Sequence, residues 1–417
     1  MTRPSTLAAF AHRNFRLFWS GQLVSLVGTW MQTVAQGWLV LTLTDDPLAL
    51  GIAATCQFLP VLLFGLFGGL IADALPKRAT LVATQFVSLL LAAVLGVLVA
   101  TKTVEVWHVY LLAVGLGLVT AVDMPVRQAF VIEMVGREHV ANAVALNSAV
   151  FNGARIIGPA AAGLLIGAAG MAACFFLNAA SYLAVLVAYL LMRSAELRPA
   201  PRMALAGTVR GVLAQLGEGL RYVRRTPSIR LVLLTLGIVA TAGMNFSVLI
   251  PVYARDVLGG DAGTFGFLMA ATGAGSLLSA LWIASGLRPS ARLVVVGAAA
   301  LGCALAAVSF VQEFALALPL MVVVGWSVIA MAASTNTMVQ LTVPDELRGR
   351  VVSIYTTIFA GSTPIGGLIA GSIAGALGVG AALLAGGAVA LATAALAATR
   401  LSSLPSGGVR PASQGVG

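Results

Sequence analysis

Twelve apolar runs follow one another along the chain, each close to the roughly 20 residues that a helix needs to cross a bilayer. Short polar breaks separate them, and the expected spans are 17–43, 48–72, 79–101, 106–126, 141–168, 172–192, 231–253, 263–286, 292–311, 315–339, 352–375 and 377–399. Charged residues make up only 9% of the chain, against about 25% in soluble proteins, and the mean hydropathy is +1.00. The sequence therefore excludes a soluble fold and predicts an all-α membrane protein with twelve transmembrane helices.

The basic residues predict the orientation of these helices. If the N-terminus is cytoplasmic, all of the 24 Lys and Arg residues fall on the cytoplasmic side except Lys102, Arg155 and Arg255. Both termini are therefore expected in the cytoplasm, with the chain in the inner membrane. The first residues show no cleavable signal pattern and are expected to stay attached. The net charge of +10 is a topology signal and does not indicate nucleic-acid binding.

Several kinds of chemistry lack the residues that they require. The only two lysines, Lys77 and Lys102, are not part of a phosphate-binding loop, so the chain itself does not use ATP directly. The three histidines lie far apart, and the three cysteines sit singly in apolar runs without a C-x-x-C spacing. We therefore expect no cofactor, no metal site and no enzymatic activity.

The spans fall into two sets of six. Residues 193–230 form the longest hydrophilic stretch and separate an N-terminal lobe at 1–192 from a C-terminal lobe at 231–400, with a disordered cytoplasmic tail at 401–417. Similar segments recur in both halves, with charged loops followed by proline and small residues near spans 5 and 11. Such repeats predict two pseudo-symmetric six-helix lobes with a substrate path between them.

The linker carries an amphipathic pattern. Apolar residues recur near helical spacing among arginines, namely Val209, Val212, Leu213, Leu216, Leu220 and Val223. This pattern predicts a helix lying along the cytoplasmic interface, and it leaves open a binding site for a regulatory partner.

A first charged motif, GGLIADALPKRATL, joins spans 2 and 3 and contains Gly69, Asp73, Lys77 and Arg78. Asp73 ends a span and can accept hydrogen bonds from helix N-terminal amides or from an arginine. If such a contact exists in only one arrangement of the lobes, it is a latch for alternating access. An ordinary interfacial charge pair of small energy is the other interpretation.

A second motif, DMPVRQAFVIEMV, places Asp123 and Arg127 one helical turn apart at the end of span 4. Asp123 lies only a few residues inside the interface. It is expected to pair with Arg127 as a structural contact, to take part in gating or coupling, or to carry a proton itself.

A third motif, ARIIGPAAAG in span 5, contains Arg155, Gly158, Pro159 and Gly163. Its small residues allow close helix approach and its proline removes a backbone hydrogen bond, so it predicts either a bend that gates the path or simple packing. Pro364 repeats the pattern in span 11. Because a charge deep in a span is costly, Arg155 is expected to contact substrate, coupling ion or gate, or to bond helix carbonyls.

Polar residues also form a stripe on span 1, at Gln22, Ser25, Thr29, Gln32, Thr33 and Gln36. Spacings of three and four place them on one helical face, which lipid would reject. Uncharged amides and hydroxyls suit a large substrate of mixed polarity, and Asn245 in span 7 is the matching candidate in the other half. Hydrogen bonding between helices is the alternative interpretation.

The three motifs resemble those of the major facilitator superfamily, and within it the drug and siderophore exporter branch, which includes enterobactin exporters and macrolide efflux proteins. The resemblance covers essentially all twelve spans. It implies that Gly69, Asp73, Lys77 and Arg78 stabilise the outward-facing state, although Leu75 and Pro76 replace a common glycine of this loop. It also identifies the span 5 motif with the glycine-proline motif of antiporters.

The function implied by this resemblance is export of an amphipathic small molecule by alternating access, driven by protons. The expected partners are the substrate, protons and the lipid bilayer, with the chain acting as a monomer. A facilitator that takes up a metabolite and a non-transporting membrane scaffold remain alternatives.

Overall fold

The computed structural model describes residues 7–198, 209–286 and 289–402, without the side chains of 66–74 and 209–215. These residues form helices and no strand. The elements are η1 (Ala8–Ala11), α1 (Arg13–Thr44), α2 (Pro47–Ala74), α3 (Lys77–Ala100), α4 (Val106–Ala169), α5 (Met171–Leu190), η2 (Ser194–Glu196), α6 (Val209–Arg225), α7 (Pro227–Gly243), α8 (Phe246–Val252), η3 (Tyr253–Val257), α9 (Ala262–Ala284), α10 (Ala291–Val308), α11 (Phe314–Thr342), α12 (Asp345–Leu377) and α13 (Val379–Ser402).

The helices agree with twelve membrane spans. Ten helical segments of the described chain are long and apolar enough to cross a membrane. One of them, α4, has 64 residues and consists of two helices that meet at a kink at Gly136. The remaining span is α1. Its 32 residues are enough to cross a membrane, but the polar stripe makes it less apolar than the other ten segments.

Two parts of the chain differ from the expected spans. The predicted loop at 127–140 is absent, because α4 stays helical on both sides of Gly136, where φ is +74° and only glycine is free of strain. The predicted span 231–253 is interrupted, since α7 ends at Gly243 and α8 begins at Phe246. Hydropathy does not reveal this interruption, because the residues on both sides of it are equally apolar.

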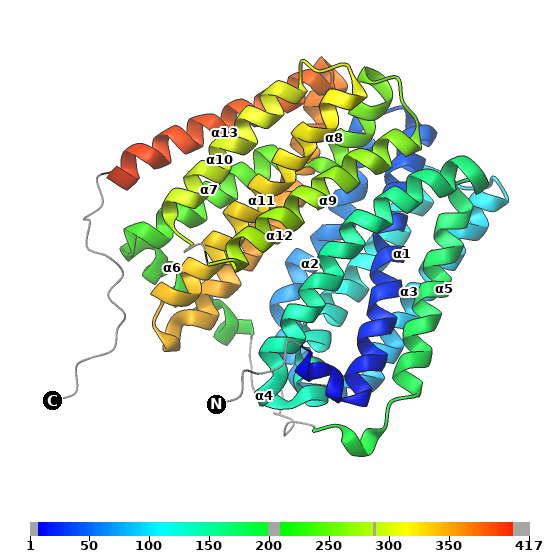
Figure 1. The fold of residues 1–417 in the computed structure, drawn as a ribbon, viewed down its shortest axis with the longest axis vertical. Helices are drawn as coiled ribbons and strands as arrows, with labels where there is room; N and C mark the ends of the chain where they lie inside the picture. The colour runs from blue at the N-terminus through cyan, green and yellow to red at the C-terminus, as the bar shows by residue number, and fades with distance from the viewer. Residues whose placement is uncertain (1–6, 199–208, 287–288, 403–417) are drawn as a thin grey trace.

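The helices form an N-terminal lobe, α1–α5, and a C-terminal lobe, α7–α13, which stand side by side in Figure 1. We call the end where α1 begins and α4 kinks the linker end, and the end where α1 stops and α2 starts the far end. The ribbons of the lobes come together toward the far end and diverge toward the linker end (Figure 1). The α6 helix of the linker packs on α7 and α12 and is therefore attached to the C-terminal lobe.

Two helix crossings join the lobes, α2 with α12 and the second half of α4 with α9. A Cβ atom on Gly51 would lie 2.9 Å from the carbonyl carbon of Gly367, and one on Gly163 would lie 2.8 Å from the Cα of Gly263. Thr55 also donates a hydrogen bond of 3.0 Å to the carbonyl oxygen of Pro364. Backbones approach this closely only where side chains are missing.

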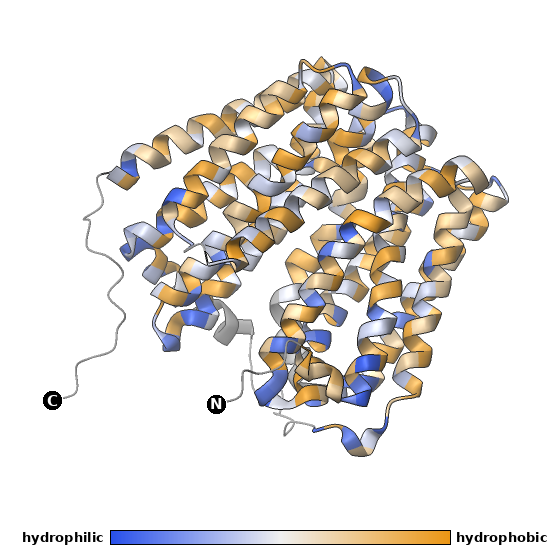
Figure 2. Cartoon of the chain, in the orientation of Figure 1, coloured by the Kyte–Doolittle hydropathy of each residue, from blue (hydrophilic) through white to orange (hydrophobic). Residues whose placement is uncertain are grey.

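The outer surface of the helices is apolar. Large side chains such as Leu111 and Leu164 are more than 60% exposed, and Figure 2 shows hydrophobic colour along the helices with hydrophilic residues gathered at their ends. Such a surface is suited to lipid contact rather than to water.

Polar contacts tie the start of the linker to the N-terminal lobe. Asn14 donates to the carbonyl oxygen of Arg193 at 2.9 Å and accepts from its amide at 3.0 Å. The amide of Arg198 donates to the carbonyl oxygen of Glu133 at 2.9 Å.

His12, which precedes α1, and His139 in α4 share a hydrogen bond of 3.0 Å between Nε2 and Nδ1.

The crossing of α9 with α11 generates a prediction about packing. A Cβ atom on Gly325 would lie 2.7 Å from the carbonyl carbon of Thr272, so Gly325→Ala should destabilise the protein by about 1–3 kcal/mol. Gly167→Ala is the control, because nothing lies within 4 Å of its Cβ position. Thermal unfolding of the purified protein in detergent should separate the two variants, and equal melting temperatures would contradict the packing.

The histidine pair generates a prediction about pH. Burial, then His139 and Arg198, lower the pKa of His12 below its ordinary value of 6.5, against a smaller opposing effect of Glu138. The unfolded chain therefore binds a proton at His12 at a higher pH than the folded chain does. The folded state consequently loses stability as the pH falls below the ordinary pKa of histidine. The melting temperature should fall more steeply between about pH 7.5 and about pH 5.5 in the wild type than in His12→Gln. Parallel pH profiles would contradict this assignment.

Candidate functional site

The polar stripe of α1 faces other helices of its own lobe. Gln22, Ser25 and Gln32 are each less than 10% exposed. The Nδ2 atom of Asn178 in α5 donates to Gln32 Oε1 at 2.6 Å, and Thr29 lies 3.5 Å from the hydroxyl of Tyr182. Much of the stripe therefore makes hydrogen bonds between helices, and a role in the substrate path stays a prediction.

The middle of the stripe borders a small polar cavity. It has a volume of about 10 Å³ and lies between α1, α2, α4 and α5, where its polar lining includes Thr29, Gln32, Thr33, Gln36 and Gln57. A space of this size holds about one water molecule. The cavity places amide and hydroxyl groups around one point inside the N-terminal lobe.

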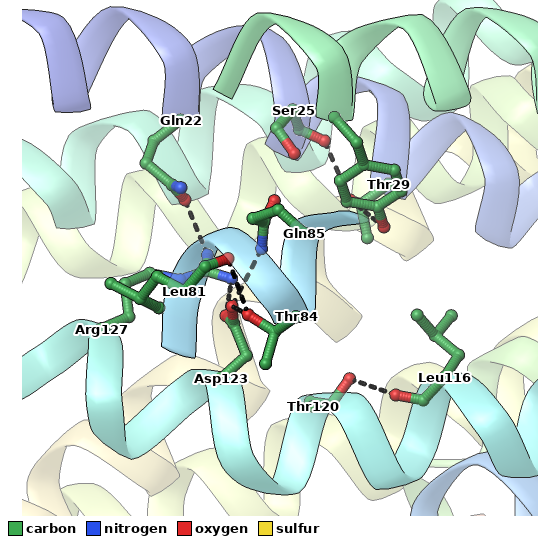
Figure 3. A network of polar contacts seen from close by, with 11 residues as sticks. Gln22, Ser25, Thr29, Leu81, Thr84, Gln85, Leu116, Thr120, Asp123 and Arg127 are labelled. Carbon is green, nitrogen blue, oxygen red and sulfur yellow. Dashed lines mark hydrogen bonds and ion pairs between the residues drawn. The ribbon is translucent and has the colours of Figure 1, made fainter. Parts of the chain in front are cut away.

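Nearer the linker end, Asp123 in α4 is the centre of a buried polar network (Figure 3). It is 3% exposed and forms an ion pair with Arg127, one turn further along the same helix. Its Oδ1 atom accepts hydrogen bonds from Thr84 at 2.7 Å and from Gln85 at 2.9 Å, both in α3. The pair expected from the sequence is thus present, with two donors that the sequence did not identify.

The same network reaches α1 through Arg127. Its Nη1 atom donates to Gln22 Oε1 at 2.6 Å, so one guanidinium joins α4 to the polar stripe. Arg127 and Gln22 are 105 positions apart, and no local pattern links them. The network therefore connects three helices of the N-terminal lobe through one ion pair.

This network is not fully satisfied. Gln22 Nε2, Gln85 Oε1, Arg127 Nε and the Tyr189 hydroxyl are buried and have no hydrogen-bond partner among the described residues. Buried polar atoms without partners are costly and uncommon in native proteins. The surroundings of Asp123 thus hold more donors and acceptors than the observed bonds use.

The first charged motif makes contacts within the N-terminal lobe. Lys77 forms a 2.8 Å ion pair with Glu133, and Arg78 donates to the carbonyl oxygens of Tyr189 and Leu190 at the end of α5. Gly69 and Asp73 lie in the stretch 66–74, where the contacts of the side chains fall outside the described part of the chain. The sequence pattern did not single out Glu133, although this residue is part of the second motif.

Arg155 lies in the second half of α4 and is half-buried. Its guanidinium lies 5.5 Å from the centre of the Trp30 ring, an arrangement typical of a cation–π contact. Among the described residues it has no ion pair or hydrogen bond, so it does not bond helix carbonyls there. Its carbonyl oxygen faces α9, where a Cβ on Gly273 would come within 2.6 Å. Arg155 therefore sits beside the junction between the lobes.

The remaining predicted residues lie at helix crossings. Gly158 packs against Trp30 of α1, and the carbonyl oxygen of Pro159 faces Gly266 of α9. In the C-terminal lobe, Asn245 is 3% exposed and its Nδ2 atom donates to the carbonyl oxygen of Thr241 at 2.8 Å. Asn245 thus supports the break between α7 and α8, and it stands apart from the Asp123 network.

Comparisons with known proteins agree with this architecture. A family model described as transmembrane secretion effector matches residues 4–411. The multidrug efflux pump Tap of Mycolicibacterium fortuitum is 31% identical over 373 residues, which cover 87% of this chain and 90% of that pump. The staphyloferrin A transporter of Staphylococcus aureus is 26% identical over 368 residues, with coverage of 87% and 90%.

Among solved structures, a POT family transporter in complex with a thioalcohol conjugated peptide has a TM-score of 0.76 at 10% identity. The match covers 94% of this chain and 96% of that one. At this identity the likeness shows the fold, and it confirms twelve helices in two lobes.

The Asp123 network generates a prediction about stability. Asp123→Ala removes the partner of a buried guanidinium and the acceptor of Thr84 and Gln85, so it should destabilise the protein by about 3–5 kcal/mol. The double variant Asp123→Leu/Arg127→Met, which removes both charges at similar volume, should be less destabilised than the single one. Melting temperatures in detergent test this order, and a double variant less stable than Asp123→Ala would refute it.

Proposed function

The chain belongs to the transmembrane secretion effector family of the major facilitator superfamily, and we propose that it exports amphipathic small molecules of drug or siderophore type. Export proceeds by alternating access and is driven by exchange for protons. A multidrug efflux pump and a siderophore transporter among its relatives support this substrate class.

The proposal rests mainly on helix α1, which contributes much of the lining of the polar cavity and also contacts the Asp123–Arg127 pair. Gln22 accepts from Arg127, and Thr29, Gln32 and Gln36 further along α1 line the cavity. Because a helix rises about 1.5 Å per residue, Gln22 and Gln36 lie roughly 21 Å apart along it. A movement of α1 therefore links the ion pair to the polar surface offered to a substrate.

Asp123 is the proton-binding group in this proposal. Protonation neutralises the carboxylate and removes the attraction that holds Arg127 against it. A buried arginine without its carboxylate needs other acceptors, so its bond to Gln22 and its position change. Gln85 Oε1 and the hydroxyl oxygen of Tyr189 have no partner, and they are acceptors with which the displaced guanidinium can form new bonds.

The lobes provide the alternating movement. The close crossings at Gly51 and Gly163 hold them together toward the far end, and opening these crossings while the linker end closes exposes the path to the other side. The loop of Gly69, Asp73, Lys77 and Arg78 acts as the latch in this cycle, and Pro159 and Pro364 lie at the bending positions.

Orientation follows from the distribution of arginine and lysine. We place the linker end, with both termini, on the cytoplasmic side of the inner membrane. The N-terminal lobe spans 1–192 and the C-terminal lobe 231–400, joined by the linker 193–230, and a monomer contains the whole path.

Transport in inverted membrane vesicles tests the proposal. Amphipathic fluorescent dyes and a siderophore are offered with and without an imposed inside-acid proton gradient. The wild type should accumulate substrate only with the gradient, and Asp123→Asn should fall to the level seen without it. Asp261→Asn is the matched control, because Asp261 is an exposed helix cap at the far end and asparagine also caps helices. Accumulation by Asp123→Asn at the wild-type level would refute the proton site.

Arg155→Ala belongs in the same assay. Loss of accumulation would place Arg155 on the path, since removal of its contact with Trp30 leaves the Asp123 pair untouched. Wild-type accumulation of every substrate would exclude that role. Accumulation indifferent to the gradient in the wild type would make the protein a facilitator.

A further inference from the structure

The linker helix α6 is attached to the C-terminal lobe at the linker end. Val223 of α6 is 6% exposed and packs in one apolar cluster with Ile229 of α7 and Val343 and Val351 of the α11–α12 region. Leu220, three residues earlier, is 43% exposed. One side of α6 is therefore anchored in the lobe, and an apolar side chain remains open beside the first turns of membrane-spanning helices.

A cavity of about 250 Å³ lies between the last two turns of α6 and the start of α12. Glu218, Arg221, Tyr222 and Arg225 line it from α6, and Leu347 lines it from α12. It combines charged groups with the ring of Tyr222 and the side chain of Leu347. It is far from the Asp123 network, which lies in the other lobe.

The charges around this cavity do not balance. Glu218 is paired with Arg350, so its negative charge is already used. Arg221 and Arg225 are exposed, and neither has an ion pair among the described residues. Two guanidinium groups therefore line the cavity without a counter-charge, and guanidinium donors match the oxygen atoms of a phosphate group.

We propose that this cavity binds the phosphate headgroup of an anionic phospholipid, of the phosphatidylglycerol class. Arg221 and Arg225 contact the phosphate, while Leu347 lies against the glycerol and the upper acyl chain. The cavity lies where α7 and α12 begin, at the level where a bilayer places its headgroups, which favours a lipid over a free anion. Neither the cargo nor the direction of transport enters this proposal.

Occupation of the cavity would connect α6 to the membrane surface. Because α6 packs on α7 and α12, a bound lipid would act on two helices of the C-terminal lobe at the end where the lobes diverge. Anionic lipid would thus adjust the stability of this lobe, and through α12 its crossing with α2.

Thermal unfolding of the purified full-length protein in detergent tests the site. Three probes are titrated separately: short-chain phosphatidylglycerol, short-chain phosphatidylcholine and inorganic phosphate. Phosphatidylglycerol should raise the melting temperature in a saturable manner, whereas the other two should not. An equal shift with phosphatidylcholine would overturn the proposal, and a full shift with inorganic phosphate would overturn it in favour of a free-anion site.

Two double variants locate the effect. Arg221→Gln/Arg225→Gln should abolish the shift, whereas Arg224→Gln/Arg230→Gln should retain it, because those two exposed arginines carry the same charge but do not line the cavity. Leu347→Trp, which fills the cavity without changing charge, should also abolish the shift and provides a second test if the first variant does not fold. A full shift in either cavity variant would overturn the proposal.

Discussion

The interior of a bilayer offers no water to a polar group, and the structure follows from that constraint. Backbone amides and carbonyls must pair within helices, which leaves long α-helices as the building elements. Helix association must then come from close packing and from side-chain hydrogen bonds, since lipid is as apolar as a leucine surface. Both kinds of contact occur here.

Close packing dominates the junction between the lobes. At Gly51, Gly163 and Gly266 the backbones meet so closely that a side chain would clash. Such contacts are short-ranged and carry no charge. The hydrogen bond from Thr55 to the carbonyl oxygen of Pro364 adds a polar contact to the crossing of α2 with α12.

A buried polar network lies in the interior of the N-terminal lobe. Asp123 gathers donors from two helices, and Arg127 extends the network to a third. A buried pair of this kind contributes little net stability relative to apolar packing, but breaking it is expensive. The Asp123–Arg127 pair lies beside buried polar atoms that have no partner. This feature distinguishes it from the ion pair of Lys77 and Glu133.

The length of apolar runs and helical periodicity are local properties that a single segment reveals, and they predicted most of the spans, the polar face of α1 and the pairing of Asp123 with Arg127. No local pattern in the sequence predicts that Gln22 forms a hydrogen bond with Arg127 or that α6 and α12 line a common cavity. The same holds for α4, whose two helices meet directly at the kink at Gly136 without a longer loop between them. These features arise from which distant helix faces lie together in the fold, and apolar spans of similar length and composition do not encode that choice in any local pattern.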